Sequence, residues 1–181
     1  PSAADLGGRA LDAADAALDA ADADFVARVA ATKRALGGDD GFARVVYVCM
    51  GTELQPPPKF WRVVRRALAV APWLLVCAVG DAPGASAALD DDDAAADGGG
   101  DDGDGGARQP SRVVYGARVP QRAVLALADA FVTHCGMNST HEALAAGVPI
   151  VALPHRGDQP QIADAVAGLG AGVALDASFG P

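Results

Sequence analysis

From residue 44 onward, short apolar runs alternate with stretches whose apolar residues have helical spacing. The runs are rich in β-branched residues and predict strands at 45–49, 73–79, 112–115, 130–133, 148–153 and 172–175. The stretches between them predict helices at 58–70, 120–127, 140–146 and 160–168. Single helices between consecutive strands imply right-handed crossovers, and the sequence therefore predicts an α/β fold with a doubly wound, mostly parallel sheet.

The first predicted strand, 45–49, is apolar at every position, as expected for a strand buried on both faces. In the helix that follows, we expect five apolar residues to face the core: Phe60, Val63, Val64, Ala67 and Leu68.

Residues 1–41 are rich in Ala and Asp and precede the α/β pattern, which we assign to a domain at 42–181. Larger apolar residues lie along one helical stripe: Leu11, Leu18, Phe25, Val29 and Leu36. Asp15 and Asp22 interrupt this stripe, so we expect a partly ordered helix or a linker rather than a coiled coil.

Residues 81–110 form a low-complexity Asp/Gly/Ala segment with nine acidic residues and one basic residue. Such a composition buries too little apolar surface to order itself, so we expect a disordered surface insertion. A functional acidic tract that binds a cation or a basic partner is the alternative.

The whole chain carries a net charge of −9, from 14 Lys and Arg against 23 Asp and Glu. Without residues 81–110 there remain 14 acids and 13 bases, so the acidity is local. This balance argues against nucleic acid or an anionic membrane surface as the main partner.

Three widely spaced cysteines, Cys49, Cys77 and Cys135, form neither a disulfide framework nor a C-x-x-C metal pair. The longest apolar stretch, 67–79, contains Pro72 and is too short to span a membrane. Because the chain begins at Pro1, we expect a fragment of a longer protein that is cytoplasmic or peripheral to a membrane.

Ligands of doubly wound sheets bind beyond the carboxyl ends of the strands, which selects the loops 49–55, 134–139 and 153–160. In the second loop, Ser139 and Glu142 have the spacing of a capping box, and a helix N-terminus favours a phosphate. The alternative is that these two residues only cap the helix.

The other two loops carry weaker signals. Gly51 allows close approach of the backbone, and Thr52 beside it offers a hydroxyl. Asp158 and Gln159 can hydrogen-bond vicinal hydroxyls together, or each can serve as a helix cap.

Taken in order, these motifs resemble the donor-binding signature of the family 1 UDP-glycosyltransferases, closest to the macrolide and sterol branch. The matching segments are Arg-Val-Pro-Gln at 118–121, Phe-Val-Thr-His-Cys-Gly-Met-Asn-Ser-Thr at 131–140, Glu-Ala-Leu at 142–144, Gly-Val-Pro at 147–149, Pro154 and Gly-Asp-Gln at 157–159. Residues 45–52 look like the first strand and loop of the same half. The resemblance covers residues 44–175 apart from the acidic insertion, and it implies the C-terminal, Rossmann-like, nucleotide-sugar-binding half of a GT-B enzyme.

The resemblance also implies a role for each site residue. His134, Asn138 and Ser139 would contact the donor pyrophosphate, in a loop shaped by Gly136 and the Met137 backbone. Gly51 and Thr52 would lie against the phosphates, Glu142 would contact the ribose, and Asp158 with Gln159 would hold the transferred sugar.

Some positions depart from the family pattern. Arg118 stands where the family often has a Trp that stacks on uracil, and a guanidinium can also stack on a base. Met137 replaces the Trp of plant members. His141 and His155 match no invariant residue, so we expect surface or packing roles for them. Cys135 and His134 leave a strand on opposite sides, which argues against a nucleophile–base pair.

By resemblance, the parent protein is an inverting glycosyltransferase that transfers a hexosyl group from a UDP-sugar to a hydroxyl of a lipid or small hydrophobic acceptor. The general base and the acceptor site would lie in an N-terminal domain, so we expect no catalytic residue, metal or other cofactor in this chain. A stand-alone nucleotide-sugar-binding subunit with a separate acceptor-binding partner is the alternative, and a degenerate binding module is a third hypothesis. A dehydrogenase is rejected, because the glycine motif at 168–172 follows a predicted helix and not a strand.

Overall fold

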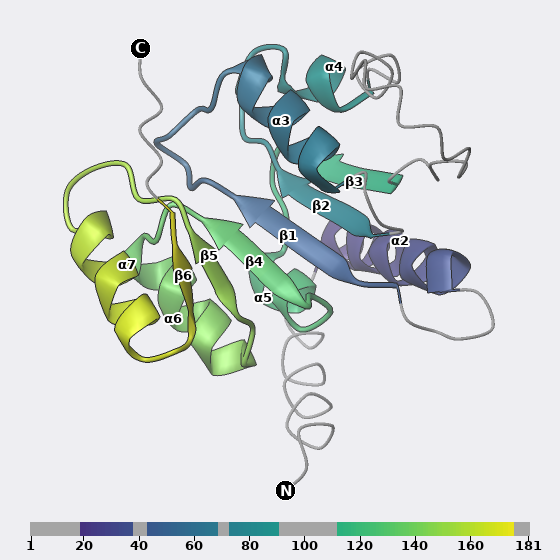
Figure 1. Cartoon of the computed structure of the whole chain (residues 1–181). Coiled ribbons are helices and arrows are strands. Elements are labelled where there is room, and N and C mark those ends of the chain that lie inside the picture. The colour runs from purple at the N-terminus through teal and green to yellow at the C-terminus, as the bar shows by residue number, and fades with distance from the viewer. Residues whose placement is uncertain (1–18, 38–42, 69–72, 91–111, 176–181) are drawn as a thin grey trace, which may run out of the picture.

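A computed structural model describes residues 19–37, 43–68, 73–90 and 112–175, which form a six-stranded sheet with helices on both faces (Figure 1). The strands are β1 (Val45–Cys49), β2 (Leu74–Ala78), β3 (Arg112–Gly116), β4 (Ala130–Thr133), β5 (Ile150–Ala152) and β6 (Gly172–Ala174). The helices are α2 (Ala20–Gly37), α3 (Pro58–Leu68), α4 (Ala85–Asp90), α5 (Gln121–Leu125), α6 (Met137–Ala146) and α7 (Gln159–Gly168).

All strand pairings in the sheet are parallel, in the order β3-β2-β1-β4-β5-β6. This is the Rossmann order, in which the direction of winding reverses between β1 and β4. The predicted doubly wound α/β fold is confirmed. The glycine motif at 168–172 lies between α7 and β6, so it does follow a helix.

The central strand β1 is buried on both faces, as predicted. Val45 and Tyr47 belong to the core cluster that includes residues of α2, α5, α6 and α7. Val46 and Val48 point to the opposite face and pack with residues of α3 and α4. Alternate side chains of one strand thus contribute to two separate cores.

The helix α2 packs on the same core as the sheet. Its Phe25 is 7% exposed and its Val29 fully buried, and Leu36 packs partly buried against this cluster. These three residues confirm the C-terminal part of the predicted stripe, whereas Leu11 and Leu18 lie outside the described residues.

A charged cluster around Asp129 joins α2, β1 and β4. The Asp129 carboxylate accepts hydrogen bonds from the Val45 backbone N–H at 2.8 Å and from the Arg44 guanidinium at 2.7 Å. Lys33 of α2 lies 3.6 Å from the same carboxylate and donates a hydrogen bond to the Leu127 carbonyl at 3.0 Å. Although partial burial alone raises the pKa of Asp129, these partners lower it on balance.

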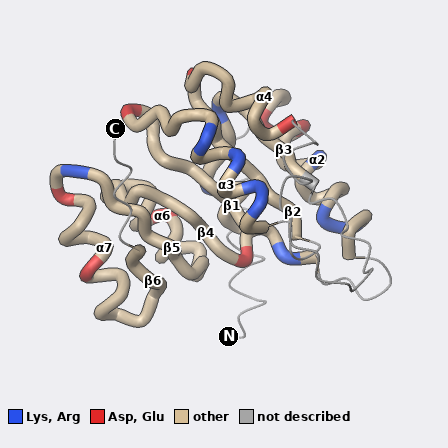
Figure 2. Tube along the Cα trace, turned by 45° about the horizontal axis from the view of Figure 1, so that its top comes forward, with Lys and Arg blue, Asp and Glu red and all other residues tan. Residues whose placement is uncertain are grey.

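The buried face of α3 agrees only in part with the one predicted: Phe60 is buried, and Val64 and Leu68 pack partly buried against the same core, whereas Val63 and Ala67 do not. Phe60 and Trp61 are buried with their rings edge to face, whereas Val63 is 55% exposed and Ala67 is also exposed. Burying the large indole removes more apolar area from water than burying a valine, which favours this rotation of the helix. Basic residues of α3 appear as blue segments in Figure 2; of these, Arg65 is buried, whereas the others are exposed: Lys59, Arg62 and Arg66.

The segment predicted to be unstructured begins later than residue 81. Residues 85–90 form α4, and its Ala85, Ala88 and Leu89 are buried in the core that it shares with α3. Because alanine side chains are small, α4 can pack closely against α3. The Ala-rich composition of this segment therefore did not indicate that it belongs to the core. The remainder of the predicted insertion, 91–110, lies outside the described residues.

Candidate functional site

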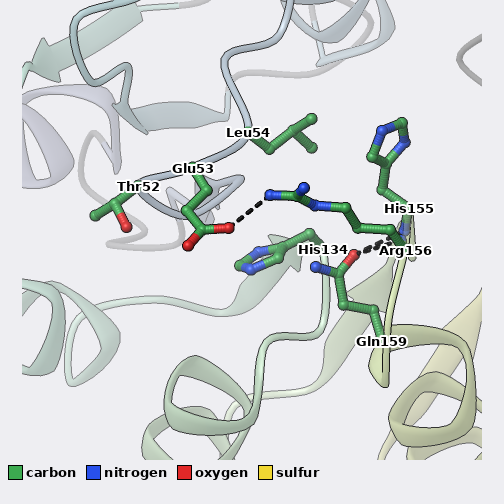
Figure 3. A pocket seen from close by; sticks show the side chains of 7 residues that line it. All are labelled: Thr52, Glu53, Leu54, His134, His155, Arg156 and Gln159. Atoms are coloured by element: carbon green, nitrogen blue, oxygen red, sulfur yellow. Dashed lines mark hydrogen bonds and ion pairs between the residues drawn. The ribbon is translucent and has the colours of Figure 1, made fainter.

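Three loops meet at the carboxyl ends of β1, β4 and β5, where the winding of the sheet reverses. Between them lies a pocket of about 180 Å³, drawn in Figure 3. Its lining residues are Thr52, Glu53, Leu54, His134, His155, Arg156 and Gln159. The pocket is smaller than the roughly 300–1,000 Å³ usual for small-molecule sites, so it can enclose only part of a nucleotide-sugar.

The His134 side chain occupies the space between two glycines. A methyl group at Gly51 would lie 2.6 Å from His134 Cε1, and one at Gly136 would lie 2.6 Å from His134 Nε2. Gly51 also has a φ of +81°, which L side chains rarely adopt. The close approach expected at Gly51 therefore involves the imidazole ring of His134.

Burial of the His134 imidazole favours its neutral form. Burial lowers its pKa, while a hydrogen bond to the Cys49 backbone and the Asp158 carboxylate nearby partly oppose that effect. A neutral imidazole has one N–H donor and one nitrogen able to accept a proton. Next to an anionic ligand, such a ring can donate a hydrogen bond or take up a proton.

The helix after β4 begins at Met137, three residues earlier than predicted, and Gly136 occupies the N-cap position. Ser139 and Glu142 therefore lie inside α6, and the predicted capping box is wrong. No side chain caps this helix, so the backbone N–H groups of its first turn remain available to a ligand.

The Gln121 side chain explains what Ser139 and Glu142 do instead. Its Nε2 donates hydrogen bonds to Ser139 Oγ at 3.1 Å and to Glu142 Oε2 at 2.7 Å. The Tyr47 hydroxyl donates to Gln121 Oε1 at 3.3 Å, so both ends of the amide are held. A residue at the start of α5 thus links β1 to α6 beside the site.

The Gln159 side chain stabilises the loop after β5. Its Oε1 accepts the backbone N–H groups of His155 at 2.8 Å and of Arg156 at 3.0 Å. Its Nε2 is left as a donor and points toward the His134 side of the pocket in Figure 3. Asp158 precedes α7 at the N-cap position and makes no side-chain cap hydrogen bond.

The other expected site residues lie outside the pocket lining. Met137 and Asn138 are exposed in the first turn of α6, and Arg118 is exposed in the connection between β3 and α5. The structure thus brings Thr52, His134 and Gln159 together, with Gly51 and Gly136 packed against His134.

Four pocket residues had no assigned ligand role: Glu53, Leu54, His155 and Arg156. Arg156 and Glu53 form an ion pair that joins the loop after β5 to the loop after β1. His155, expected to have a surface or packing role, is exposed and also lines the pocket. The only sequence signal for these residues was their position in the loops at the strand ends.

Cys135 points into the core while His134 faces the pocket, as expected for adjacent residues leaving a strand. Cys135 has a φ of +63° and a buried side chain, and burial raises the pKa of its thiol. These properties argue against a nucleophile at this position.

In the part of the chain that the structure describes, no three or more His, Cys, Asp or Glu residues are grouped so that they could hold a metal ion. None of the helices in that part is long and apolar enough to cross a membrane.

Comparison with known proteins relates this chain to one family. Residues 108–179 match the family model described as "UDP-glucoronosyl and UDP-glucosyl transferase". NDP-glycosyltransferase YjiC of Bacillus subtilis is 30% identical over 131 residues, covering 72% of this chain and 29% of that protein. Oleandomycin glycosyltransferase of Streptomyces antibioticus is 33% identical over 133 residues, covering 72% of this chain and 26% of that protein.

A solved structure shares the fold. Os79 from O. sativa in complex with UDP gives a TM-score of 0.57 at 26% identity, covering 74% of this chain and 27% of that chain. The chain spans less than a third of the length of each of these relatives. The family model, the sequence relatives and the fold agree with the resemblance seen in the sequence: this chain carries a UDP-glycosyltransferase domain with the Rossmann-like fold of the GT-B glycosyltransferases.

Proposed function

We propose that this domain binds the UDP-sugar donor of an inverting glycosyltransferase, of which residues 42–181 form the C-terminal half. The observation that carries the proposal is the packing of His134 between Gly51 and Gly136, beside the uncapped N-terminus of α6. Backbone N–H groups and an imidazole at one strand end suit a diphosphate.

In this proposal the diphosphate lies over the first turn of α6. His134 and the backbone N–H groups of the helix contact the diphosphate. Further contacts come from Asn138 and Ser139 of the helix and from the small residues Gly51 and Thr52. These groups stabilise the negative charge that grows on the UDP leaving group when the anomeric bond breaks. Their contribution is electrostatic, and the proposal assigns no role to a metal ion or another cofactor.

The remaining contacts orient the two ends of the donor. Glu142, which is held in place by a hydrogen bond from Gln121, accepts hydrogen bonds from the ribose hydroxyls. Arg118 stacks on the uracil ring. Gln159 donates from Nε2 to a sugar hydroxyl, because its Oε1 is already used by the loop, and Asp158 accepts from a neighbouring hydroxyl.

The acceptor and the general base belong, in this proposal, to an N-terminal domain outside this chain. Transfer of a hexosyl group to a hydroxyl of a small hydrophobic or lipid acceptor is supported by a solved complex of Os79 with U2F and trichothecene. A lipid acceptor would be met in the cytoplasm or at the periphery of a membrane, where we place the parent protein.

The test is an NMR titration of the 181-residue chain with UDP, with NAD as the control ligand. We expect saturable shifts around β1, β4 and α6 with UDP and none with NAD. His134→Ala should weaken UDP binding, whereas the control substitution His141→Ala, at an exposed histidine on α6, should leave it unchanged. Equal binding of both nucleotides, or no UDP binding by the folded chain, would refute the proposal.

A further inference from the structure

A charged pair spans the pocket, and the proposed function gives it no role. Glu53 follows β1 and Arg156 follows β5, and their side chains form an ion pair within the pocket lining. Figure 3 shows the two side chains approaching from opposite sides, between Leu54 and His134. Apart from the two histidines, they are the ionisable side chains that line the pocket.

The position of Arg156 is fixed by the residue assigned to the sugar. Gln159 Oε1 accepts the backbone N–H of Arg156 at 3.0 Å, which holds this loop against the start of α7. A sugar that reaches Gln159 Nε2 therefore lies within reach of the Glu53–Arg156 pair. The Asp158 carboxylate lies outside the pocket lining but acts on His134 through its charge, so it adds a second negative charge near the site.

We propose that Glu53, by neutralising Arg156, makes the pocket select a donor whose sugar is a neutral hexose over a donor whose sugar is a uronic acid. The inference rests on the proposed function and distinguishes the two donor classes named in the family description, glucosyl and glucuronosyl. A carboxylate on the sugar would have to displace Glu53 from Arg156, and it would then lie beside two like charges, Glu53 and Asp158.

The expected preference is moderate, because the pair is solvated. The Arg156 and Glu53 side chains are 59% and 82% exposed, and exposed ion pairs have small net effects. We expect UDP-glucose to bind about three- to tenfold more tightly than UDP-glucuronic acid.

Two substitutions should move this preference in opposite directions. Glu53→Gln frees the guanidinium, so UDP-glucuronic acid should bind as tightly as UDP-glucose or more tightly. Arg156→Gln leaves Glu53 unpaired, so the preference for UDP-glucose should widen. Asp24→Asn is the matched control, because Asp24 forms an exposed pair with Arg28 on α2, away from the pocket, and should leave the ratio unchanged.

The experiment is an NMR titration of the full 181-residue chain and these variants with UDP, UDP-glucose and UDP-glucuronic acid. Opposite shifts of the affinity ratio, with UDP affinity unchanged, would support the inference. An unchanged ratio in Glu53→Gln that still binds UDP would overturn it and leave the proposed function standing. Weaker binding of UDP itself to Arg156→Gln would assign Arg156 to the diphosphate and also overturn it. No binding of UDP to the unsubstituted chain would refute the proposed function and this inference with it.

Discussion

Replacing the glycines around His134 should separate backbone strain from contact with the imidazole ring. Gly51→Ala combines both effects, with a φ of +81° and a methyl group 2.6 Å from the ring. Gly136→Ala makes an equally close contact at a φ of −64°, which any residue adopts. Gly147→Ala has a φ of +69° in open space and introduces strain alone.

The expected losses in unfolding free energy follow from these geometries. A left-handed backbone conformation destabilises a non-glycine residue by about 1–2 kcal/mol, and we expect Gly147→Ala to lose this much unfolding free energy. Overpacking costs about 1–3 kcal/mol, which we expect for Gly136→Ala. Gly51→Ala should lose about 2–5 kcal/mol, the sum of the two effects.

Urea denaturation, followed by circular dichroism, measures each loss. The decisive variant is Gly51→Ala in a His134→Ala background, where the ring is absent and only strain remains. There the substitution should cost about 1–2 kcal/mol, as Gly147→Ala does. If Gly51→Ala costs the same with and without the His134 ring, the ring does not limit the space at Gly51 and our account of the site is wrong.

Three further predictions concern charge and hydrogen bonding. UDP binding at pH 7 should be accompanied by uptake of a fraction of a proton, because burial lowers the pKa of His134 and a bound diphosphate raises it. Calorimetry in buffers of different ionisation enthalpy measures this proton uptake, and His134→Gln should abolish it. Because the pKa of Asp129 is lower in the folded than in the unfolded state, its carboxylate stabilises the fold. This stabilisation is fully present above the unfolded-state pKa of about 3.9 and is lost as the pH falls through the folded-state pKa. Asp129→Asn should therefore cost about 1–2 kcal/mol in urea denaturation at pH 7 and flatten the acid limb of the stability curve. Gln121→Leu should cost about 1 kcal/mol and weaken UDP binding, whereas unchanged binding would show that Glu142 needs no such support.

The sheet could be predicted from the sequence because its two most deeply buried strands, β1 and β2, consist of continuous apolar runs, which a local pattern is enough to identify. The buried face of α3 could be predicted only in part: Phe60, Val64 and Leu68 pack on the core as expected, but Trp61 is buried in place of Val63. Its sequence allows Val63 or Trp61 to face inward, and the choice depends on α4, which an Ala/Asp-rich sequence concealed.

At the site, the strand-end rule selected the loops that line the pocket, but not the side-chain partners within them. Ser139 and Glu142 have a local capping pattern, yet both accept hydrogen bonds from Gln121, about twenty residues earlier. The Glu53–Arg156 pair joins residues separated by 103 positions, and no local pattern reports such a contact. Spacing within a loop predicts its backbone, whereas side-chain partners depend on the assembled sheet.

The position of β1 at the centre of the sheet has a consequence for the order of folding. β1 pairs with β2 on one side, but its other neighbour is β4, and the hydrogen bond from Val45 to Asp129 spans 84 residues. The entropy of closing so long a loop opposes this pairing until many native contacts form together, which slows folding. The pocket needs both strands, so the ability to bind a nucleotide should arise late, with completion of the sheet. A ligand that recognises only the finished pocket would then act mainly on unfolding, lengthening the lifetime of the folded chain while leaving its folding rate nearly unchanged.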